Sequence, residues 1–268
     1  MLRQRVITGS LLAVLVVLIV YFLPSELFAV VVLAMFSIGA WEWARLTRIG
    51  GAGARLAYLA AVLGVAALAW WSAIHAGSIA PVAIGGLWWL IVLVVLAVRE
   101  PGHGLAVGGR IAYRLAGVLT LVPAWVALVV LHRQGWLMVL FLVVLTALAD
   151  TAAYFTGKAF GRTKLAPSIS PGKTREGLLG ALAASVLAGV AGAWLLEIEA
   201  GLWFYFIGVC VVTTLFSVTG DLFESLVKRE AGEKDSGRIL PGHGGMLDRI
   251  DSLTAAAPAF ALGLLWLR

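Results

Sequence analysis

The chain has 268 residues, of which 62% are hydrophobic and only 13% are charged. A soluble domain typically has about a quarter of its residues charged, so a soluble core of this length could not hide so much apolar surface. Composition therefore excludes an ordinary soluble domain and indicates a protein whose excess apolar surface faces lipid. The single cysteine, Cys210, lies in an apolar run and leaves no disulfide framework.

Apolar runs long enough to cross the roughly 30 Å hydrocarbon core of a bilayer recur along the whole chain. The first follows Arg3 and Arg5 without a prompt small-residue cleavage site, so we expect a retained span rather than a signal peptide. The runs are continuous rather than alternating, which predicts an all-α, polytopic helical bundle of about nine transmembrane helices. They fall at 6–23, 27–44, 56–74, 79–98, 115–132, 136–157, 177–196, 202–220 and 253–267.

The basic residues predict how these spans are oriented. If the N-terminus lies in the cytoplasm, all of the 20 Lys and Arg except Arg133 and Arg268 fall on the cytoplasmic side. This asymmetry is a strong positive-inside signal, and it supports nine spans because dropping one would invert everything downstream. We expect a multi-pass protein of a bacterial inner (plasma) membrane, with any active site facing the cytoplasm. The first eight of these charges, from Arg3 to Arg114, can be explained as topology signals and lipid-headgroup contacts.

The polar residues divide the chain into two parts. We assign 1–135 to N-terminal transmembrane helices and 136–268 to a C-terminal transmembrane catalytic region, because the largest polar stretches, the cytoplasmic loops 158–176 and 223–252, both fall there. In the first part, Glu42 is expected to be an interfacial acid in an aromatic belt. In the second, Asp150 lies within an apolar run and must face the bundle interior or a wet cavity, as a ligand or as a structural hydrogen-bond hub.

The first polar stretch contains Gly172-Lys173-Thr174, which is suggestive of a phosphate-binding P-loop. The full pattern needs a glycine five residues before Gly172, where Pro167 stands, and no strand precedes it, so we reject a P-loop. What remains is a rigid turn that presents Lys173 and Arg175 just before a helix, where an anion site can form. A plain juxtamembrane basic cluster is the alternative.

The second polar stretch is rich in glycine and interleaves acidic and basic residues. Asp221, Ser225 and Lys228 are spaced i, i+4, i+7, so they share one helical face at the end of the eighth run. Asp248 and Asp251 share a face where the last helix is expected to begin, and either could instead be a helix cap or a first-turn acid.

Such residues suit chemistry at a phosphate group. Two carboxylates can hold Mg²⁺, which prefers oxygen ligands and phosphate company, while several Lys and Arg can neutralise phosphate oxygens. Phosphoryl-type transfer depends mostly on positioning and charge stabilisation. His243, flanked by glycine, could contact phosphate or take part in proton transfer. The residues alone do not name the substrates.

The segment from Ser225 to Asp251 resembles the signature of phosphatidate cytidylyltransferases, also called CDP-diacylglycerol synthases. It reads Ser-x-apolar-Lys-Arg, four residues, Lys-Asp, and later His-Gly-Gly-apolar-x-Asp-Arg-apolar-Asp. Asp150-Thr151 and the stretch from Ser170 to Thr174 are also similar to the family. Arg175 departs from it, because an aromatic or apolar residue is common there.

The resemblance implies that CTP and phosphatidate give CDP-diacylglycerol and pyrophosphate in phospholipid biosynthesis, with no nucleic acid involved. It implies Mg²⁺ bound by Asp221 and Asp248, with Asp251 as a further candidate, K⁺ as a candidate second cation, and a homodimer. Asp221, Asp248 and Lys173 are the expected catalytic residues. The residues expected to bind the substrates are Lys173, Arg175, Ser225, Lys228, Arg229, Lys234, Asp235, His243, Gly244, Arg249 and Asp150.

Two other functions stay open on the sequence. A polyprenol kinase-like enzyme would also use CTP to modify a lipid. An ion-coupled transporter would use Asp150 and Asp221 as ion or proton sites, although the sequence shows no internal repeat. Mg²⁺-dependent consumption of CTP would distinguish the enzymes from a transporter.

Overall fold

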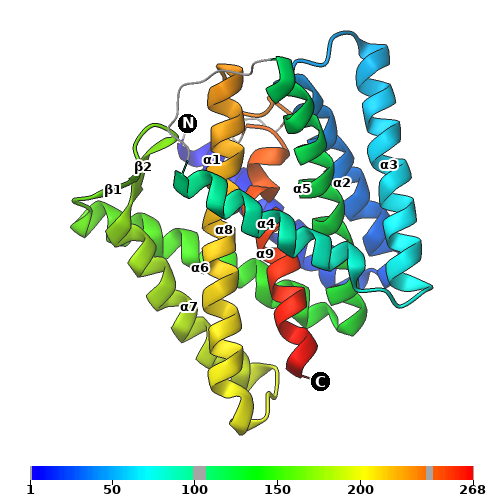
Figure 1. Cartoon of the computed structure of the whole chain (residues 1–268). Helices are drawn as coiled ribbons and strands as arrows, with labels where there is room; N and C mark the ends of the chain where they lie inside the picture. Colours follow the sequence, from blue (N-terminus) through cyan, green and yellow to red (C-terminus); the bar gives the residue numbers. More distant parts are fainter. Residues whose placement is uncertain (1, 99–106, 240–243, 268) are drawn as a thin grey trace.

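The computed structural model describes residues 2–98, 107–239 and 244–267 (Figure 1). These residues form nine α-helices, two 3₁₀ turns and one β-hairpin. In the described part of the chain, eight helices are long and apolar enough to cross a membrane, and α1 contributes a shorter apolar stretch, Gly9–Phe22. The prediction of a polytopic helical membrane bundle is therefore confirmed.

Each helix overlaps one of the predicted apolar runs, but α5 and α9 begin earlier than predicted and α8 ends later. Their bounds are α1 (Leu2–Phe22), α2 (Ser25–Leu46), α3 (Ala52–Ile74), α4 (Ala80–Val98), α5 (Val107–Gln134), α6 (Trp136–Phe160), α7 (Arg175–Leu195), α8 (Trp203–Ala231) and α9 (Leu247–Gly263). The 3₁₀ turns η1 (Ala200–Leu202) and η2 (Leu264–Leu267) precede α8 and follow α9.

The helices of both halves of the chain pack together. Figure 1 shows α7 on one side, α2, α3 and α5 on the other, and α8 and α9 between them, while α6 crosses from the end of α5 toward the hairpin. The last helix, α9, contacts α2, α4 and α5 as well as α8. Close approach depends on small residues: a Cβ added at Gly85 of α4 would lie 2.6 Å from Cβ of Pro123 in α5 and 3.2 Å from Cβ of Pro258 in α9.

The second polar loop is shorter than predicted. Instead of covering 223–252, it is bounded by the end of α8 at Ala231 and the start of α9 at Leu247. The residues that end α8 include Glu, Leu, Lys and Arg, which favour helix and carry it past the apolar run. Gly232, with φ of 78°, then ends α8 in the left-handed conformation that glycine adopts readily.

The first polar loop contains a β-hairpin that the sequence did not predict. Strands β1 (Lys164–Ala166) and β2 (Ser170–Thr174) pair antiparallel, and α7 follows β2 directly. The hairpin is tied to α7 by Glu176, whose carboxylate accepts the N–H groups of Arg162 at 3.1 Å and Thr163 at 3.2 Å. The predicted rigid turn is therefore a hairpin, and it holds Lys173 in a strand.

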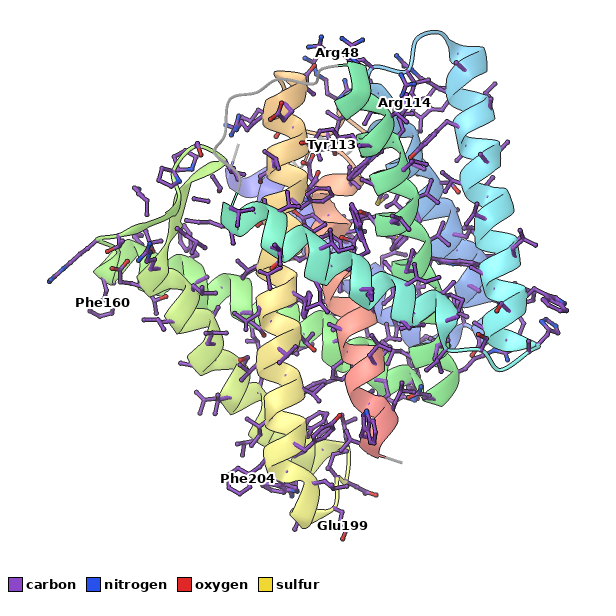
Figure 2. All side chains as sticks on the ribbon, in the orientation of Figure 1. Arg48, Tyr113, Arg114, Phe160, Glu199 and Phe204 are labelled. Carbon is purple, nitrogen blue, oxygen red and sulfur yellow. The ribbon has the colours of Figure 1, made fainter. Side chains whose placement is uncertain are left out.

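Charged side chains mark one end of the bundle. Figure 2 shows Arg48 and Arg114 at the end where α8 finishes, whereas Glu199 and Phe204 lie at the opposite end. The last turn of α8 adds Lys228 and Arg229 to the first end. The residues of the predicted site therefore share one end of the molecule with much of its positive charge.

Candidate active site

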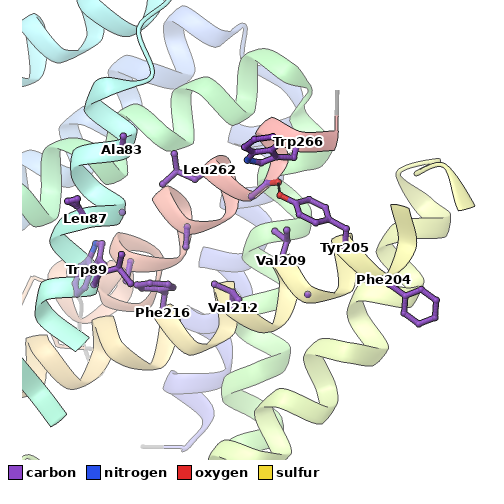
Figure 3. Close-up of a pocket in the computed structure, with 16 residues that line it drawn as sticks. Ala83, Leu87, Trp89, Phe204, Tyr205, Val209, Val212, Phe216, Leu262 and Trp266 are labelled. Carbon is purple, nitrogen blue, oxygen red and sulfur yellow. Dashed lines mark hydrogen bonds between the residues drawn. The ribbon is translucent and has the colours of Figure 1, made fainter. Parts of the chain in front are cut away.

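One cavity in the described structure is apolar and is a poor candidate for chemistry at phosphate. It has a volume of about 690 Å³ and lies between α4, α8 and α9 (Figure 3). Its walls include Leu87, Phe216 and Leu262, and none of the described residues that line it is charged. On α8 it is lined by Val212, which lies nine residues before Asp221 and therefore on the opposite side of the helix.

A second cavity, of about 440 Å³, brings predicted site residues together. Asp150 from α6, Lys173 from β2 and Asp221 from α8 all line it. The side chain of Asp150 is exposed there, so the residue faces a cavity, as its position in an apolar run required. We call this space the charged cavity.

Glycines bring the walls of the charged cavity close to one another. A Cβ added at Gly157 of α6 would lie 2.9 Å from Oγ1 of Thr174, and one at Gly177 of α7 would lie 2.8 Å from the carbonyl oxygen of Ala153. Thr174 also caps α7, because its Oγ1 accepts the N–H of Gly177 at 3.0 Å. The packing of α6 on α7 thus fixes the strand that carries Lys173 beside Asp150.

Lys173 and Asp221 form the first of two acid–lysine pairs. Their Nζ and Oδ2 atoms are 2.7 Å apart, and the side chains are 25% and 27% exposed. The other carboxylate oxygen of Asp221 accepts a hydrogen bond of 3.3 Å from Oγ of Ser225. The shared helical face of Asp221 and Ser225 is therefore confirmed, and the pair remains open to the charged cavity.

Lys228 and Asp248 form the second pair, which is more enclosed. Nζ and Oδ1 are again 2.7 Å apart, but the side chains are only 12% and 8% exposed. Oδ2 of Asp248 accepts the backbone N–H groups of Gly245 at 2.8 Å and Ser236 at 2.9 Å. Gly244 has φ of 80°, and a Cβ added there would lie 2.6 Å from Oδ2 of Asp248, so this position requires glycine.

Glu224 belongs to the same cluster, although it was not among the residues predicted from the sequence. Its side chain is 3% exposed, and within the described structure neither carboxylate oxygen has a hydrogen-bond donor. Nζ of Lys228 lies 3.5 Å away, and the carboxyl group of Asp251 faces it. Glu224 follows Asp221 by three residues, so the rule that grouped Asp221 with Ser225 could have found it.

The donor set suits a hard cation. Carboxylate oxygens are the ligands that Mg²⁺ prefers, and a buried carboxylate without a donor is costly unless a positive charge lies beside it. Within the described residues, however, no three His, Cys, Asp or Glu side chains are gathered as a preformed metal cluster. The two expected ligands, Asp221 and Asp248, are each paired with a lysine instead.

Other residues predicted to bind substrate lie outside the charged cavity. Arg175, Lys234, Asp235 and Arg249 are exposed and do not line it. Arg229 is also exposed, and its Nε donates to the carbonyl oxygen of Ile169 at 3.4 Å.

The last two predicted residues are Asp251, which the structure describes, and His243, which it does not. Asp251 lies in α9 beyond the first turn, where its Oδ1 accepts the N–H of Ser252 at 2.7 Å, so it is not a helix cap. His243 lies outside the described residues.

Comparison with known proteins identifies the chain's family. Residues 3–267 match the model described as the cytidylyltransferase family. The chain belongs to the cytidylyltransferase family. Its membership confirms the resemblance seen in the sequence and makes the protein an enzyme, a nucleotidyltransferase of the multi-pass membrane type, rather than a transporter.

Curated relatives of this cytidylyltransferase are bacterial proteins named phosphatidate cytidylyltransferase. The chain is 41% identical to the one from Pseudomonas aeruginosa over 269 residues, which cover 99% of this chain and 97% of the relative. It is 34% identical to the one from Haemophilus influenzae over 282 residues, covering 97% and 98%. A shorter match to the Staphylococcus aureus protein has 43% identity over 127 residues, covering 47% and 48%.

Proposed function

We propose that this cytidylyltransferase transfers the cytidylyl group of CTP to phosphatidate, giving CDP-diacylglycerol and pyrophosphate. The observation that carries the proposal is the charged cavity, where Lys173, Asp150 and Asp221 meet at the polar end of the bundle. A lipid phosphate at this membrane end can meet a nucleotide that arrives from water. The names of the nearly full-length relatives supply the two substrates.

The reaction balances without an added base. An oxygen of the phosphatidate phosphate bonds to the α-phosphorus of CTP, and the bond from that phosphorus to the bridging oxygen breaks, releasing pyrophosphate. A phosphate monoester has a second pKa of about 6, so it is already a competent nucleophile near neutral pH. The protein's task is therefore to hold two polyanions close together and to neutralise their charge.

The two acid–lysine pairs can provide this neutralisation. Lys173 and Lys228 are held by Asp221 and Asp248 and can be shared with phosphate oxygens when the substrates enter. Asp221 and Asp248, with Glu224 or Asp251 nearby, would hold Mg²⁺, which when bound supplies further charge neutralisation at phosphate. K⁺ as a second cation stays a prediction. Asp150, exposed in the cavity wall, has the position of a residue that contacts a ligand rather than that of a buried hub.

We infer that the charged cavity faces the cytoplasm of a bacterial inner membrane. The support is the distribution of Lys and Arg along the sequence and the position of Arg48 and Arg114 at the same end as the site. The homodimer implied by the family resemblance also stays a prediction.

The test is pyrophosphate release from CTP by detergent-purified protein with Mg²⁺, with and without phosphatidate. Asp248→Ala is assayed beside Glu26→Ala, which removes an exposed acid that pairs with Arg133. We expect release that needs phosphatidate, vanishes in Asp248→Ala and persists in Glu26→Ala. Folded wild-type protein that releases no pyrophosphate with any of several phosphatidates would contradict the proposal.

A further inference from the structure

Glu42 of α2 is buried, which corrects its predicted place at the membrane interface. The residue is only 3% exposed, although it lies in the first half of the chain, far in sequence from the site. Its carboxylate accepts the backbone N–H of Met246 at 3.1 Å and of Leu247 at 2.8 Å, and the hydroxyl of Ser236 at 3.1 Å. Glu42 therefore binds the loop before α9 and the first residue of α9 itself.

Glu42 acts as the helix cap that α9 lacks. Met246, at the N-cap position of α9, provides no side-chain cap, so the first N–H groups of the helix need another acceptor. The Glu42 carboxylate accepts two of them from another helix, and its negative charge complements the positive end of the α9 dipole. Asp248 lies in that first turn, one residue after Leu247.

Ser236 connects Glu42 to Asp248. Its hydroxyl oxygen lies 3.1 Å from Oε2 of Glu42 and 3.0 Å from Oδ2 of Asp248, and it accepts the N–H of Asp248 at 3.3 Å. A hydroxyl has one proton to donate. Because Oδ2 of Asp248 already accepts two backbone N–H groups, we assign the Ser236 hydroxyl proton to the hydrogen bond with Glu42. The result is an ordered chain from the Asp248 N–H through the Ser236 hydroxyl to Glu42.

The loop before α9 leaves space for the Glu42 carboxylate. A Cβ added at Gly237 would overlap Oε1 of Glu42, and one at Gly245 would overlap Oγ of Ser236, so both positions leave room that only glycine gives. Nη2 of Arg45, one turn along α2, donates to the carbonyl oxygen of Ser236 at 2.5 Å. A purely apolar contact between α2 and the loop would need neither the space left by these two glycines nor a buried carboxylate. A buried charge is costly unless hydrogen-bond donors surround it.

We propose that Glu42 is a positioning residue for Asp248, fixing its carboxylate for the metal and phosphate chemistry from the other half of the chain. The inference rests on the proposed function, in which Asp248 binds Mg²⁺. Glu42 touches no substrate in this arrangement. Glu42 holds in place the loop and the start of α9, and backbone N–H groups of this loop orient the Asp248 carboxylate. Residues that hydrogen-bond to metal ligands generally orient them in this way.

The test compares Glu42→Gln with Glu26→Gln, a matched change in an exposed acid on the same helix. Mn²⁺ binding to the full chain in detergent is measured by electron paramagnetic resonance without substrate, together with the Mg²⁺ dependence of pyrophosphate release. Loss of an outer partner typically weakens metal binding or activity by about 10–100-fold. We expect a change of that size in both measurements for Glu42→Gln, and wild-type values for Glu26→Gln.

A second pair of variants separates positioning from general stability. Ser236→Ala should also weaken Mn²⁺ binding, and the double variant with Glu42→Gln should be no weaker than Glu42→Gln alone, because both changes break one chain. If Glu42→Gln does not fold, Glu42→Asp keeps the charge but shortens the reach, and intermediate weakening is expected.

Folded Glu42 variants with wild-type Mn²⁺ affinity and Mg²⁺ dependence would overturn the inference about Glu42 but leave the proposed function standing. Wild-type protein that neither binds Mn²⁺ nor releases pyrophosphate would instead overturn the proposed function on which the inference rests.

Discussion

The two acid–lysine pairs have the same chemistry and the same 2.7 Å separation, but their surroundings differ. Lys173–Asp221 is about a quarter exposed and borders the charged cavity, whereas Lys228–Asp248 is almost enclosed and held by backbone N–H groups. An open pair can exchange its partner for a ligand at small cost, while an enclosed pair also supports the fold. The comparison predicts that activity depends on both pairs but stability mainly on the second.

Asp248→Asn should have the largest effect, because it removes an expected metal ligand and the closer of the two acids beside the enclosed Lys228, leaving Glu224 at 3.5 Å. We expect pyrophosphate release to fall by roughly 10³-fold, near the upper range for losing a preorganised electrostatic group. Breaking a buried pair typically costs about 3–5 kcal/mol, so thermal unfolding in detergent should also shift to a clearly lower temperature. An inactive variant of unchanged thermal stability would show that the enclosed pair does not support the fold.

Asp221→Asn should separate the effect on activity from the effect on stability. We expect activity to fall by roughly 10²-fold, while the unfolding temperature changes little because exposed ion pairs contribute about 0–1 kcal/mol. Thermal unfolding measured beside Asp248→Asn makes the comparison direct. Equal losses of stability in the two variants would break the distinction between the open and the enclosed pair.

Lys173→Gln should reduce kcat/KM for CTP about tenfold or more, since a hydrogen bond to a charged group contributes about 1.5–3 kcal/mol. Arg175→Gln is the matched control, because Arg175 is two residues away but does not line the charged cavity. Steady-state kinetics at fixed phosphatidate checks both. Equal losses in the two variants would place the nucleotide outside this cavity.

Gly244→Ala should have the smallest effect of the series. Its positive φ and its closeness to Oδ2 of Asp248 make a methyl group unfavourable by about 1–2 kcal/mol, so the Mg²⁺ requirement should rise several-fold. Gly232→Ala is the control, because Gly232 also has a positive φ but a Cβ added there meets nothing within 4 Å. A similar Mg²⁺ dependence in both variants would argue that the Gly244 turn does not shape the enclosed pair.

The sequence predicted what depends on local spacing. The apolar runs gave the helices, and the i, i+4 spacing of Asp221 and Ser225 gave a hydrogen bond that the structure contains. The same rule, applied to a three-residue spacing, would have found Glu224. The signature segment also gave the correct family.

The sequence could not predict contacts between distant segments. Glu42 resembles any acid between two tryptophans, and only the packing of α2 on α9 shows that its carboxylate is enclosed. The hairpin was missed for a related reason: its strands are short, β2 contains Pro171 and Gly172, and the tie through Glu176 is a tertiary contact.

The contact between Glu42 and Leu247 spans 205 residues, which has a consequence for biosynthesis. During synthesis α2 enters the membrane among the first helices, and α9 is the last to emerge. Until Ser236 and the start of α9 have been made, the Glu42 carboxylate lacks the three donors that it finally binds, and such a group in an apolar setting is costly. The helical bundle is therefore completed at its functional end only when α9 docks. Chains released before α9 lack both Asp248 and the backbone N–H groups of Met246 and Leu247 that the Glu42 carboxylate accepts.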